Sequence, residues 1–389
     1  MTSYKEALGK VLRGAKTKTH TTNYKNIKNG ILAEDIKSKR DNPYYNNSLL
    51  DGFAFKASDT KNNFFFKING ELAVGENRKI TYVKNNCYRV STGGKIVHPF
   101  DCMLPYEKIN IIDGLVQIPS KIKSFTNVRL RGSDFKKNKV LIKKNQFITP
   151  AKKLLIKSSG NQKIKLYEKP NLFLFCSGDE ITDKVELNEK TINSIPEYFE
   201  SYQDKLNYNF KYLGIVRDNK KEIDKIFSKL SRLKNSIIVS TGGVSAGHKD
   251  YFPNYLKQKR YNILFHKIKM QPGRPTLFAK KNDNYYFGLP GNPISTIVGF
   301  HLLISPLILK LQNQEMKIKS SNILHNYSKN ENLTQIRRAW LSEKGLKIIS
   351  DQESYKLNSL VKANTLVILD QKKKLIKKGE KVKYISYDN

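Results

Sequence analysis

The spacing of apolar residues changes several times along this chain, and each change predicts a different kind of secondary structure. Between residues 171 and 312, short β-branched or aromatic runs alternate with segments in which apolar residues return every three or four positions. The runs are typical of buried strands and the segments of helices. Strands are expected at 172–175, 210–216, 237–240 and 285–287, and helices at 195–206, 221–233 and from about 295. This alternation predicts a parallel α/β domain with right-handed connections.

The rest of the chain follows other patterns. The first 40 residues or so predict a helical start, and short strand-like runs over 50–125 predict a compact β-rich insertion. Short strands return after about residue 316. The expected fold class is therefore a multidomain α/β plus β protein. The expected domains are an N-terminal helical and linker domain (1–50 with 127–168), a β-rich insertion (51–126), an α/β domain (169–315) and a C-terminal small β-barrel (316–389).

Charge changes this picture little. The chain of 389 residues carries 71 lysines and arginines against 34 aspartates and glutamates, a formal net charge of +37. Such a charge attracts polyanions, including nucleic acids and phosphorylated metabolites. Lysine is spread along the whole chain, however, and no basic stripe alternates with stacking aromatic residues as single-strand binding requires. We therefore expect no specific nucleic-acid partner.

Cysteine usage and hydropathy favour a cytoplasmic protein without membrane contact. Cys87, Cys102 and Cys176 lie far apart and form no CxxC pair, which argues against a disulfide framework or a zinc site. The N-terminal residues contain no apolar run of the kind that signal peptides have. The most apolar stretch, 297–311, is too short to span a bilayer and contains His301, so a core helix is expected there.

Two glycine-containing loops follow expected strands. Glycine lets the backbone turn sharply and bring its amide groups close to a ligand, while proline makes a turn rigid. Loops at the carboxyl ends of parallel strands are where open α/β sheets bind ligands, and exposed amides favour anions. Two such loops predict a phosphorylated ligand held between them. The first loop contains Gly242, Gly243, Ser245 and Gly247, and the second Pro290, Gly291, Asn292, Pro293 and Ser295.

Acidic residues would share the same edge of the sheet. Ser177, Gly178 and Glu180 follow one expected strand, Asp218 follows the next along the chain, and Asp250 follows the first glycine loop. Carboxylates beside a phosphate are good oxygen ligands for Mg²⁺. The sequence therefore predicts a metal–phosphate site with Glu180, Asp218 and Asp250 as metal ligands.

Other candidate residues are less specific. Arg274, between Pro272 and Pro275, would present a stiffly held positive charge to an oxyanion. Asp51 before Gly52 is by itself typical of a hairpin turn. Thr92 and Asp134 are by themselves equally typical of turns.

Taken in order, these segments resemble the molybdopterin molybdenumtransferase family, which includes bacterial MoeA and the E-domain of gephyrin. The resemblance covers nearly the whole chain in the family's domain order, through 47–54, 177–180, 242–251, 272–275, 289–293 and the region around Arg338 and Ser354. Related molybdopterin adenylyltransferases share the glycine motifs but correspond roughly to the α/β domain alone. The Asp51-Gly52 segment, the insertion and the tail therefore favour the transferase.

The resemblance implies insertion of molybdate into adenylylated molybdopterin with release of AMP, which forms the molybdenum cofactor. It also implies a homodimer, with the active site between the α/β domain of one subunit and the insertion of the other, and an adenylyltransferase as a candidate partner. Pyrophosphate cleavage would need Mg²⁺ on carboxylates. By motif position, Asp51, Glu180, Asp218 and Asp250 are the candidate catalytic residues. Candidate substrate contacts also include Thr92, Asp134, Pro290, Pro293, Arg338 and Ser354.

The chain departs from the family pattern in ways that leave alternatives open. Gln271 stands where lysine is common, which removes one positive charge. The tripeptide 193–195 is Asn-Ser-Ile where the family has Asp-Ser-Asn, which removes a carboxylate and an amide. The alternatives are an altered anion preference, such as tungstate, an adenylyltransferase that uses ATP, and a scaffold that binds molybdopterin without turnover.

Overall fold

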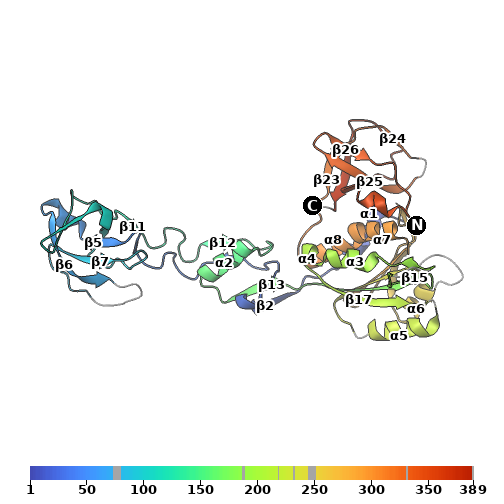
Figure 1. Cartoon of the computed structure of the whole chain (residues 1–389). Helices are drawn as coiled ribbons and strands as arrows, with labels where there is room; N and C mark the ends of the chain where they lie inside the picture. Colours follow the sequence, from blue (N-terminus) through green and yellow to red (C-terminus); the bar gives the residue numbers. More distant parts are fainter. Residues whose placement is uncertain are drawn as a thin grey trace. The chain divides into compact units, whose positions relative to one another are not determined.

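The computed structural model describes residues 1–72, 80–185, 189–217, 219–230, 233–243, 251–329 and 332–387. Its chain forms two compact units (Figure 1). One unit is Thr21–Leu166, and the other combines Met1–His20 with Tyr167–Asn389. We call them the insertion unit and the main unit.

The main unit contains a six-stranded sheet in the order β17-β14-β18-β22-β21-β19. Its strands are β17 (Asn209–Val216), β14 (Asn171–Ser177), β18 (Ser236–Thr241), β22 (Asn284–Leu289), β21 (Leu277–Lys281) and β19 (Asn262–His266). The first four run parallel, as the sequence predicts. The sheet is extended by β21 and β19, which the sequence analysis does not name, and β21 is antiparallel to both of its neighbours. A two-residue turn with Asn282 at φ +54° folds β21 directly back onto β22.

Helices cover both faces of this sheet because its strands alternate their side chains between two cores. Ile237 and Val239 face one core and Ile238 the other. The second core is closed by α5 (Lys220–Leu230) and α6 (Tyr251–Gln258), which lie on one side of the sheet in Figure 1. The first core is closed by α1 (Tyr4–Leu12), α3 (Ile195–Ser201), α4 (Gln203–Leu206), α7 (Pro293–Gly299), a π-helical turn (Phe300–Ile304) and α8 (Ser305–Leu311).

The run Pro293–Leu311 is the one helical segment in the described part of the chain that is long and apolar enough to cross a membrane. Of its most apolar window, 83% is buried inside the protein. Its side chains, including Leu302, Leu303 and Leu307, pack in the first core. The segment is therefore a core helix, as its sequence predicts.

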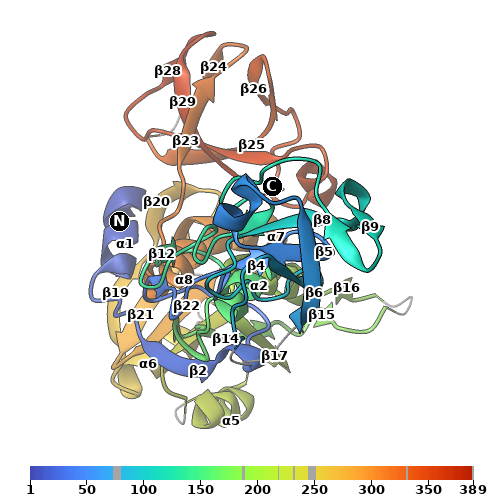
Figure 2. The same cartoon turned by 90° about the vertical axis from the view of Figure 1, so that its left-hand side faces the viewer.

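The C-terminal strands close into a small barrel, which lies above the α/β layer in Figure 2. A bridge between Ile323 and Leu346 completes the ring, and both side chains are buried in its interior. The neighbouring strand β20 (Ile268–Gln271) pairs in parallel with β25 (Thr334–Ser342) and so joins the barrel to the α/β layer. The ring runs through β25 (Thr334–Ser342), β27 (Thr365–Leu369), β29 (Lys381–Ser386), β23 (Lys319–Asn322) and β26 (Gly345–Ile348).

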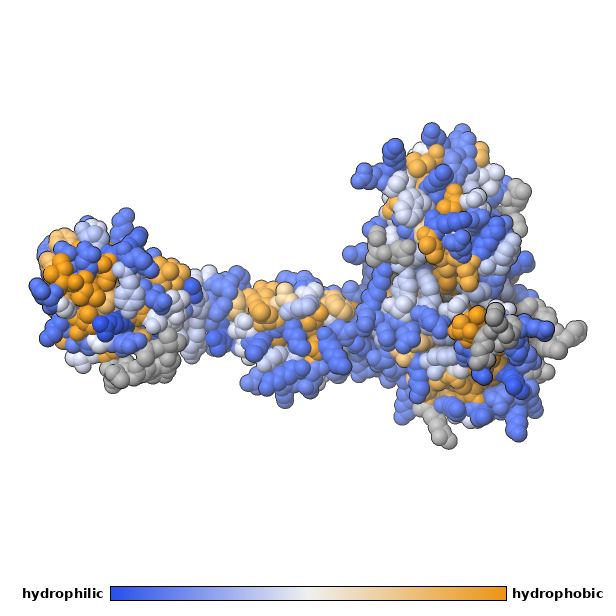
Figure 3. Space-filling model, in the orientation of Figure 1, coloured by the Kyte–Doolittle hydropathy of each residue, from blue (hydrophilic) through white to orange (hydrophobic). Residues whose placement is uncertain are grey.

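The insertion unit is built on a second six-stranded sheet, in the order β8-β5-β7-β6-β10-β9. The strands are β8 (Cys102–Pro105), β5 (Gly52–Phe55), β7 (Asn86–Val90), β6 (Phe65–Leu72), β10 (Leu115–Gln117) and β9 (Asn110–Ile112). Figure 3 shows hydrophobic surface on this part of the unit. Its exposed apolar side chains include Phe65, Ile112 and Leu115. A helix, α2 (Pro150–Ser158), is capped by the Thr149 hydroxyl, which accepts from the Lys152 N–H.

The predicted helical start is wrong beyond residue 12. After α1 the backbone turns at Gly14, which has φ +70°, and the segment 19–37 contains two short strands and one 3₁₀ turn (Tyr24–Asn26) instead. Of these strands, β2 (Thr19–Asn23) pairs with β13 (Lys163–Tyr167). Likewise β3 (Ile36–Lys37) pairs with β12 (Val140–Ile142). Partners more than 100 residues away therefore override the local spacing of apolar residues.

Candidate active site

Three loops meet at the carboxyl ends of β14, β18 and β22 in the main unit. The Gly242 N–H donates to the carbonyl of Leu289 at 3.0 Å, which joins the loop after β18 to the loop after β22. A Cβ on Gly242 would lie 2.2 Å from the carbonyl oxygen of Ser177, and one on Gly291 would lie 3.6 Å from Gly242 Cα. The two glycine loops and the Ser177 loop thus form one contiguous rim, as their order in the sequence predicts.

Backbone conformation explains the glycine pair in the loop after β18. Gly242 and Gly243 have φ of +82° and +65°, a region that side chains rarely adopt. A Cβ on Gly243 would also lie 2.2 Å from the ring of Phe252, in α6. This close approach packs the loop against α6. The residues Ser245, Gly247, Asp218 and Asp250, which the sequence also assigns to this rim, lie outside the described residues.

Of the three predicted metal ligands, Glu180 is the one that lies within the described residues. Ser177 ends β14 and is buried, whereas Glu180 is exposed. Gly178 has φ +150°, and its missing Cβ would lie 2.6 Å from a Glu180 carboxylate oxygen. Glycine therefore leaves the room in which the carboxylate lies over the backbone. In the described part of the chain, no three His, Cys, Asp or Glu residues are grouped as metal ligands.

The loop after β22 is rigid and leads directly into helix α7. Asn292 caps α7 by accepting the Ile294 N–H at 3.2 Å on its side-chain oxygen. The Thr296 hydroxyl donates to the Pro290 carbonyl at 2.6 Å, and Pro293 is the first residue of the helix. Ser295 is buried, with its carbonyl 3.8 Å from the Cβ position of Gly273. The loop that contains Arg274 therefore lies against the start of α7.

Positive charge lies on and beside that loop. Arg274 is exposed, and its carbonyl accepts the Ile268 N–H at 2.9 Å. Gln271, which replaces a lysine common in the family, accepts a hydrogen bond from Arg337 Nη2 at 3.3 Å on its Oε1. The Arg337 Nε donates to the Tyr327 hydroxyl at 2.6 Å. The guanidinium of Arg337 thus lies beside the position where the family resemblance implies a lost charge, and sequence reasoning missed this neighbour.

Arg338 and Ser354 are linked through one loop of the barrel. Arg338 is 1% exposed, and its Nη2 donates to the carbonyls of Asp351 at 2.8 Å and Glu353 at 3.2 Å. Burial lowers the pKa of its guanidinium. Arg338 therefore holds the loop that presents Ser354, rather than lying exposed itself.

The insertion unit holds the remaining candidates in two places. Asp51 accepts the Thr92 N–H at 2.6 Å and the Thr92 hydroxyl at 3.0 Å on the same carboxylate oxygen, so these two candidates lie together. Asp134 accepts the side-chain amide of Asn42 at 2.8 Å. Gly52 is required because a Cβ would lie 2.0 Å from the carbonyl oxygen of Leu104 in the adjacent strand.

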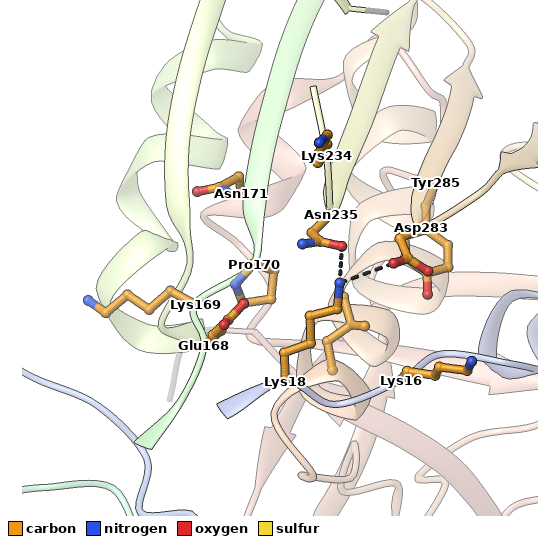
Figure 4. Close-up of a pocket in the computed structure, with 11 residues that line it drawn as sticks. Lys16, Lys18, Glu168, Lys169, Pro170, Asn171, Lys234, Asn235, Asp283 and Tyr285 are labelled. Carbon is orange, nitrogen blue, oxygen red and sulfur yellow. Dashed lines mark hydrogen bonds and ion pairs between the residues drawn. The ribbon is translucent and has the colours of Figure 1, made fainter. Parts of the chain in front are cut away.

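A cavity of about 100 Å³ lies at the opposite, amino-terminal edge of the main-unit sheet. Lys18 points between Asn235 and Asp283, and its Nζ is 3.0 Å from the Asp283 carboxylate (Figure 4). This ion pair lowers the pKa of Asp283. Because the Lys18 charge is paired and open α/β sheets bind ligands at the other edge, the glycine rim is the stronger candidate for an active site.

Comparison with known proteins identifies the family. Three family models match consecutive segments: the MoeA N-terminal region (domain I and II) over residues 2–160, a probable molybdopterin binding domain over 174–310, and the MoeA C-terminal region (domain IV) over 323–387. The chain belongs to the MoeA family. The rim loops fall in the segment that matches the probable molybdopterin binding domain, and Arg338 and Ser354 fall in the segment that matches domain IV.

Individual relatives match over nearly their whole length. A molybdopterin molybdenumtransferase of Haemophilus influenzae is 28% identical over 385 residues, covering 94% of this chain and 93% of that protein. One of Staphylococcus aureus is 27% identical over 376 residues, covering 92% and 88%. The crystal structure of a molybdopterin biosynthesis MoeA protein from Pyrococcus horikoshii superposes with a TM-score of 0.83 at 23% identity, covering 99% of both chains. This last likeness shows that the MoeA fold is shared.

Proposed function

We propose that this MoeA protein inserts molybdate into adenylylated molybdopterin, with release of AMP and formation of molybdenum cofactor. The observation that carries the proposal is the single rim formed by Ser177, Gly242 and Gly291 in a chain that family models match almost from end to end. The relatives named molybdopterin molybdenumtransferase support it over more than nine-tenths of the chain. The chain is accordingly a transferase of molybdenum cofactor biosynthesis.

The rim suits a substrate that carries a pyrophosphate. The positive end of the α7 helix dipole and the closely approaching backbone of the glycine loops favour a negatively charged group. Arg274 supplies a cation for the incoming molybdate. Glu180 positions a water that attacks the α-phosphorus. The phosphoanhydride bond then breaks, AMP leaves with the water oxygen, and the other phosphate stays on the pterin.

A divalent cation completes the proposed site. Glu180, with Asp218 and Asp250, supplies the hard oxygen donors that Mg²⁺ prefers, and the ion would neutralise pyrophosphate charge. The support is the exposed carboxylate of Glu180 directly after β14, together with acidic residues after the neighbouring strands in the sequence.

We propose that the protein is a cytoplasmic homodimer. Asp51 and Thr92, joined in the insertion unit, would complete the site on the rim of the other subunit, with Asp134 and Ser354 as further contacts. A molybdopterin adenylyltransferase, which makes the adenylylated substrate, is the proposed upstream partner.

The test is AMP release from adenylylated molybdopterin with Mg²⁺, with and without molybdate. We expect release that depends on molybdate and that falls at least a hundredfold in Glu180→Gln. Asp283→Asn, at the opposite edge of the sheet, is the matched control and should retain activity. Pyrophosphate formed from ATP would instead indicate an adenylyltransferase. Tight substrate binding without AMP release would indicate a scaffold.

A further inference from the structure

A hydrogen-bonded group of three side chains lies beside the end of β14, outside the residues assigned so far. The Tyr212 hydroxyl, from β17, donates to the two carboxylate oxygens of Asp183 at 2.9 and 3.0 Å. The side-chain amide of Asn193 donates to Asp183 Oδ1 and to the Tyr212 oxygen, both at 2.9 Å. Tyr212 is paired with Leu174 of β14 in the parallel ladder between β14 and β17. The group is therefore attached to the strand from which the rim begins.

The backbone brings Asp183 and Asn193 together. β15 (Ile181–Thr182) pairs in parallel with β16 (Thr191–Ile192), and Asp183 and Asn193 are the residues that directly follow these two strands. The Asn193 N–H donates to the Thr182 carbonyl at 2.8 Å, which continues the ladder by one residue. Their proximity is thus fixed by main-chain pairing.

The Asp183 carboxylate is held from its buried side and open on the other. Asn193 is 9% exposed, whereas Asp183 is exposed. The main cause that raises the pKa of Tyr212 is burial, so its hydroxyl stays protonated and donates to the carboxylate. A carboxylate has about four acceptor positions, and the two donors leave the others available to a ligand.

This arrangement bears on position 193, where the family resemblance implies a carboxylate that this chain lacks. Asn193 stands in that place, and Asp183 brings a carboxylate to within 2.9 Å of its side-chain nitrogen. We propose that Asp183 binds the substrate and that its carboxylate accepts hydrogen bonds from the N–H groups of the pterin's aminopyrimidinone ring. This inference rests on the proposed function, and Asn193 and Tyr212 are positioning residues in it.

The chemistry favours the pterin over the other parts of the substrate. A carboxylate repels phosphate and molybdate, so it needs a partner that carries donors. An aminopyrimidinone ring presents a ring N–H and an exocyclic amine side by side, which match the two oxygens of one carboxylate as the paired N–H groups of arginine do. AMP offers an amine and hydroxyls as its donors, which makes it the comparison ligand.

The experiment measures the Kd of adenylylated molybdopterin and of AMP for the full-length protein, in EDTA and without molybdate. In Asp183→Asn we expect the Kd of the pterin substrate to rise roughly tenfold to a hundredfold, the usual effect of losing charge-assisted hydrogen bonds. The Kd of AMP should stay unchanged. The double variant D183N/N193D, which returns a carboxylate to the neighbouring position, should recover most of the lost affinity. Asp283→Asn is the control and should bind both ligands like the wild type.

An unchanged Kd of the pterin substrate in Asp183→Asn would overturn the inference. An equal loss of AMP affinity would also overturn it, because the carboxylate would then contact the nucleotide. An effect that appears only when Mg²⁺ replaces EDTA would assign Asp183 to the metal and contradict the pterin contact. If the wild type binds the substrate but releases no AMP, the proposed function fails alone, and the Kd values still decide the role of Asp183.

Discussion

Replacing Gly242 with alanine is the sharpest perturbation of the rim. The added Cβ would lie 2.2 Å from the Ser177 carbonyl oxygen, and the residue has φ +82°. Left-handed backbone costs a residue with a side chain roughly 1–2 kcal/mol. The clash adds to this, because a contact of about 3.2 Å or more requires the two loops to separate by ~1 Å. A displacement of that size at a reacting site costs on the order of a hundredfold in rate.

A matched variant separates the two contributions. Gly379, in the barrel of the same unit, has φ +86° and nothing within 4 Å of its Cβ position. Gly379→Ala should therefore lose about 1–2 kcal/mol of unfolding free energy and keep its activity. Gly242→Ala should lose more stability and at least a hundredfold in molybdate-dependent AMP release.

Urea unfolding followed by tryptophan fluorescence measures this difference. The chain has one tryptophan, Trp340, which lies in β25 of the same unit as both glycines. Equal losses of stability in the two variants, together with wild-type AMP release by Gly242→Ala, would refute the close contact between the Ser177 and Gly242 loops.

Three further predictions follow from buried or paired side chains. His301 accepts or donates at 2.6 Å to the Tyr198 hydroxyl, and burial lowers its pKa to about 3. Because the imidazole binds a proton more readily in the unfolded chain, the free energy of unfolding is retained above pH ~6.5 and falls as the pH is lowered toward 3. Between pH 7 and 5 the wild type should lose about 2 kcal/mol more than His301→Gln. Equal pH slopes in urea titrations of the two proteins would contradict this. Arg338→Ala should cost about 3 kcal/mol in the same assay because it removes the buried guanidinium and its two hydrogen bonds to the carbonyls of Asp351 and Glu353. A loss below ~1 kcal/mol would count against the clamp on the Ser354 loop. Asp51→Asn should reduce AMP release at least tenfold and leave tryptophan-detected unfolding unchanged, since Trp340 and Asp51 lie in different units; wild-type kinetics would remove Asp51 from the site.

Much of the main unit could be predicted because its signals are local. The run 237–240 falls within β18, and apolar spacing over 221–233 marks α5, since each element shows its own periodicity. The rim follows from the same logic, because the loops after parallel strands must meet at one edge. The reversal of β21 was missed, although Asn282 and Asp283 between two apolar runs are a hairpin signal.

The remainder depends on pairs that no local pattern reveals. Arg337 reaches Gln271 only because β20 pairs with β25, some 64 residues further along the chain. Asp183 reaches Asn193 through two strands of two residues each, which are too short to have a periodicity. The strands at 19–23 and 36–37 likewise depend on partners beyond residue 139. Such contacts set the electrostatics of the site without leaving a motif.

The most direct test of the account is the stoichiometry of the reaction. Purified protein would be given adenylylated molybdopterin, Mg²⁺ and molybdate, and the molybdenum bound to pterin would be measured against the AMP released. The account predicts one molybdenum inserted per AMP, with neither product formed when molybdate or Glu180 is removed. AMP released at the same rate without molybdate, or molybdenum bound without AMP, would contradict it.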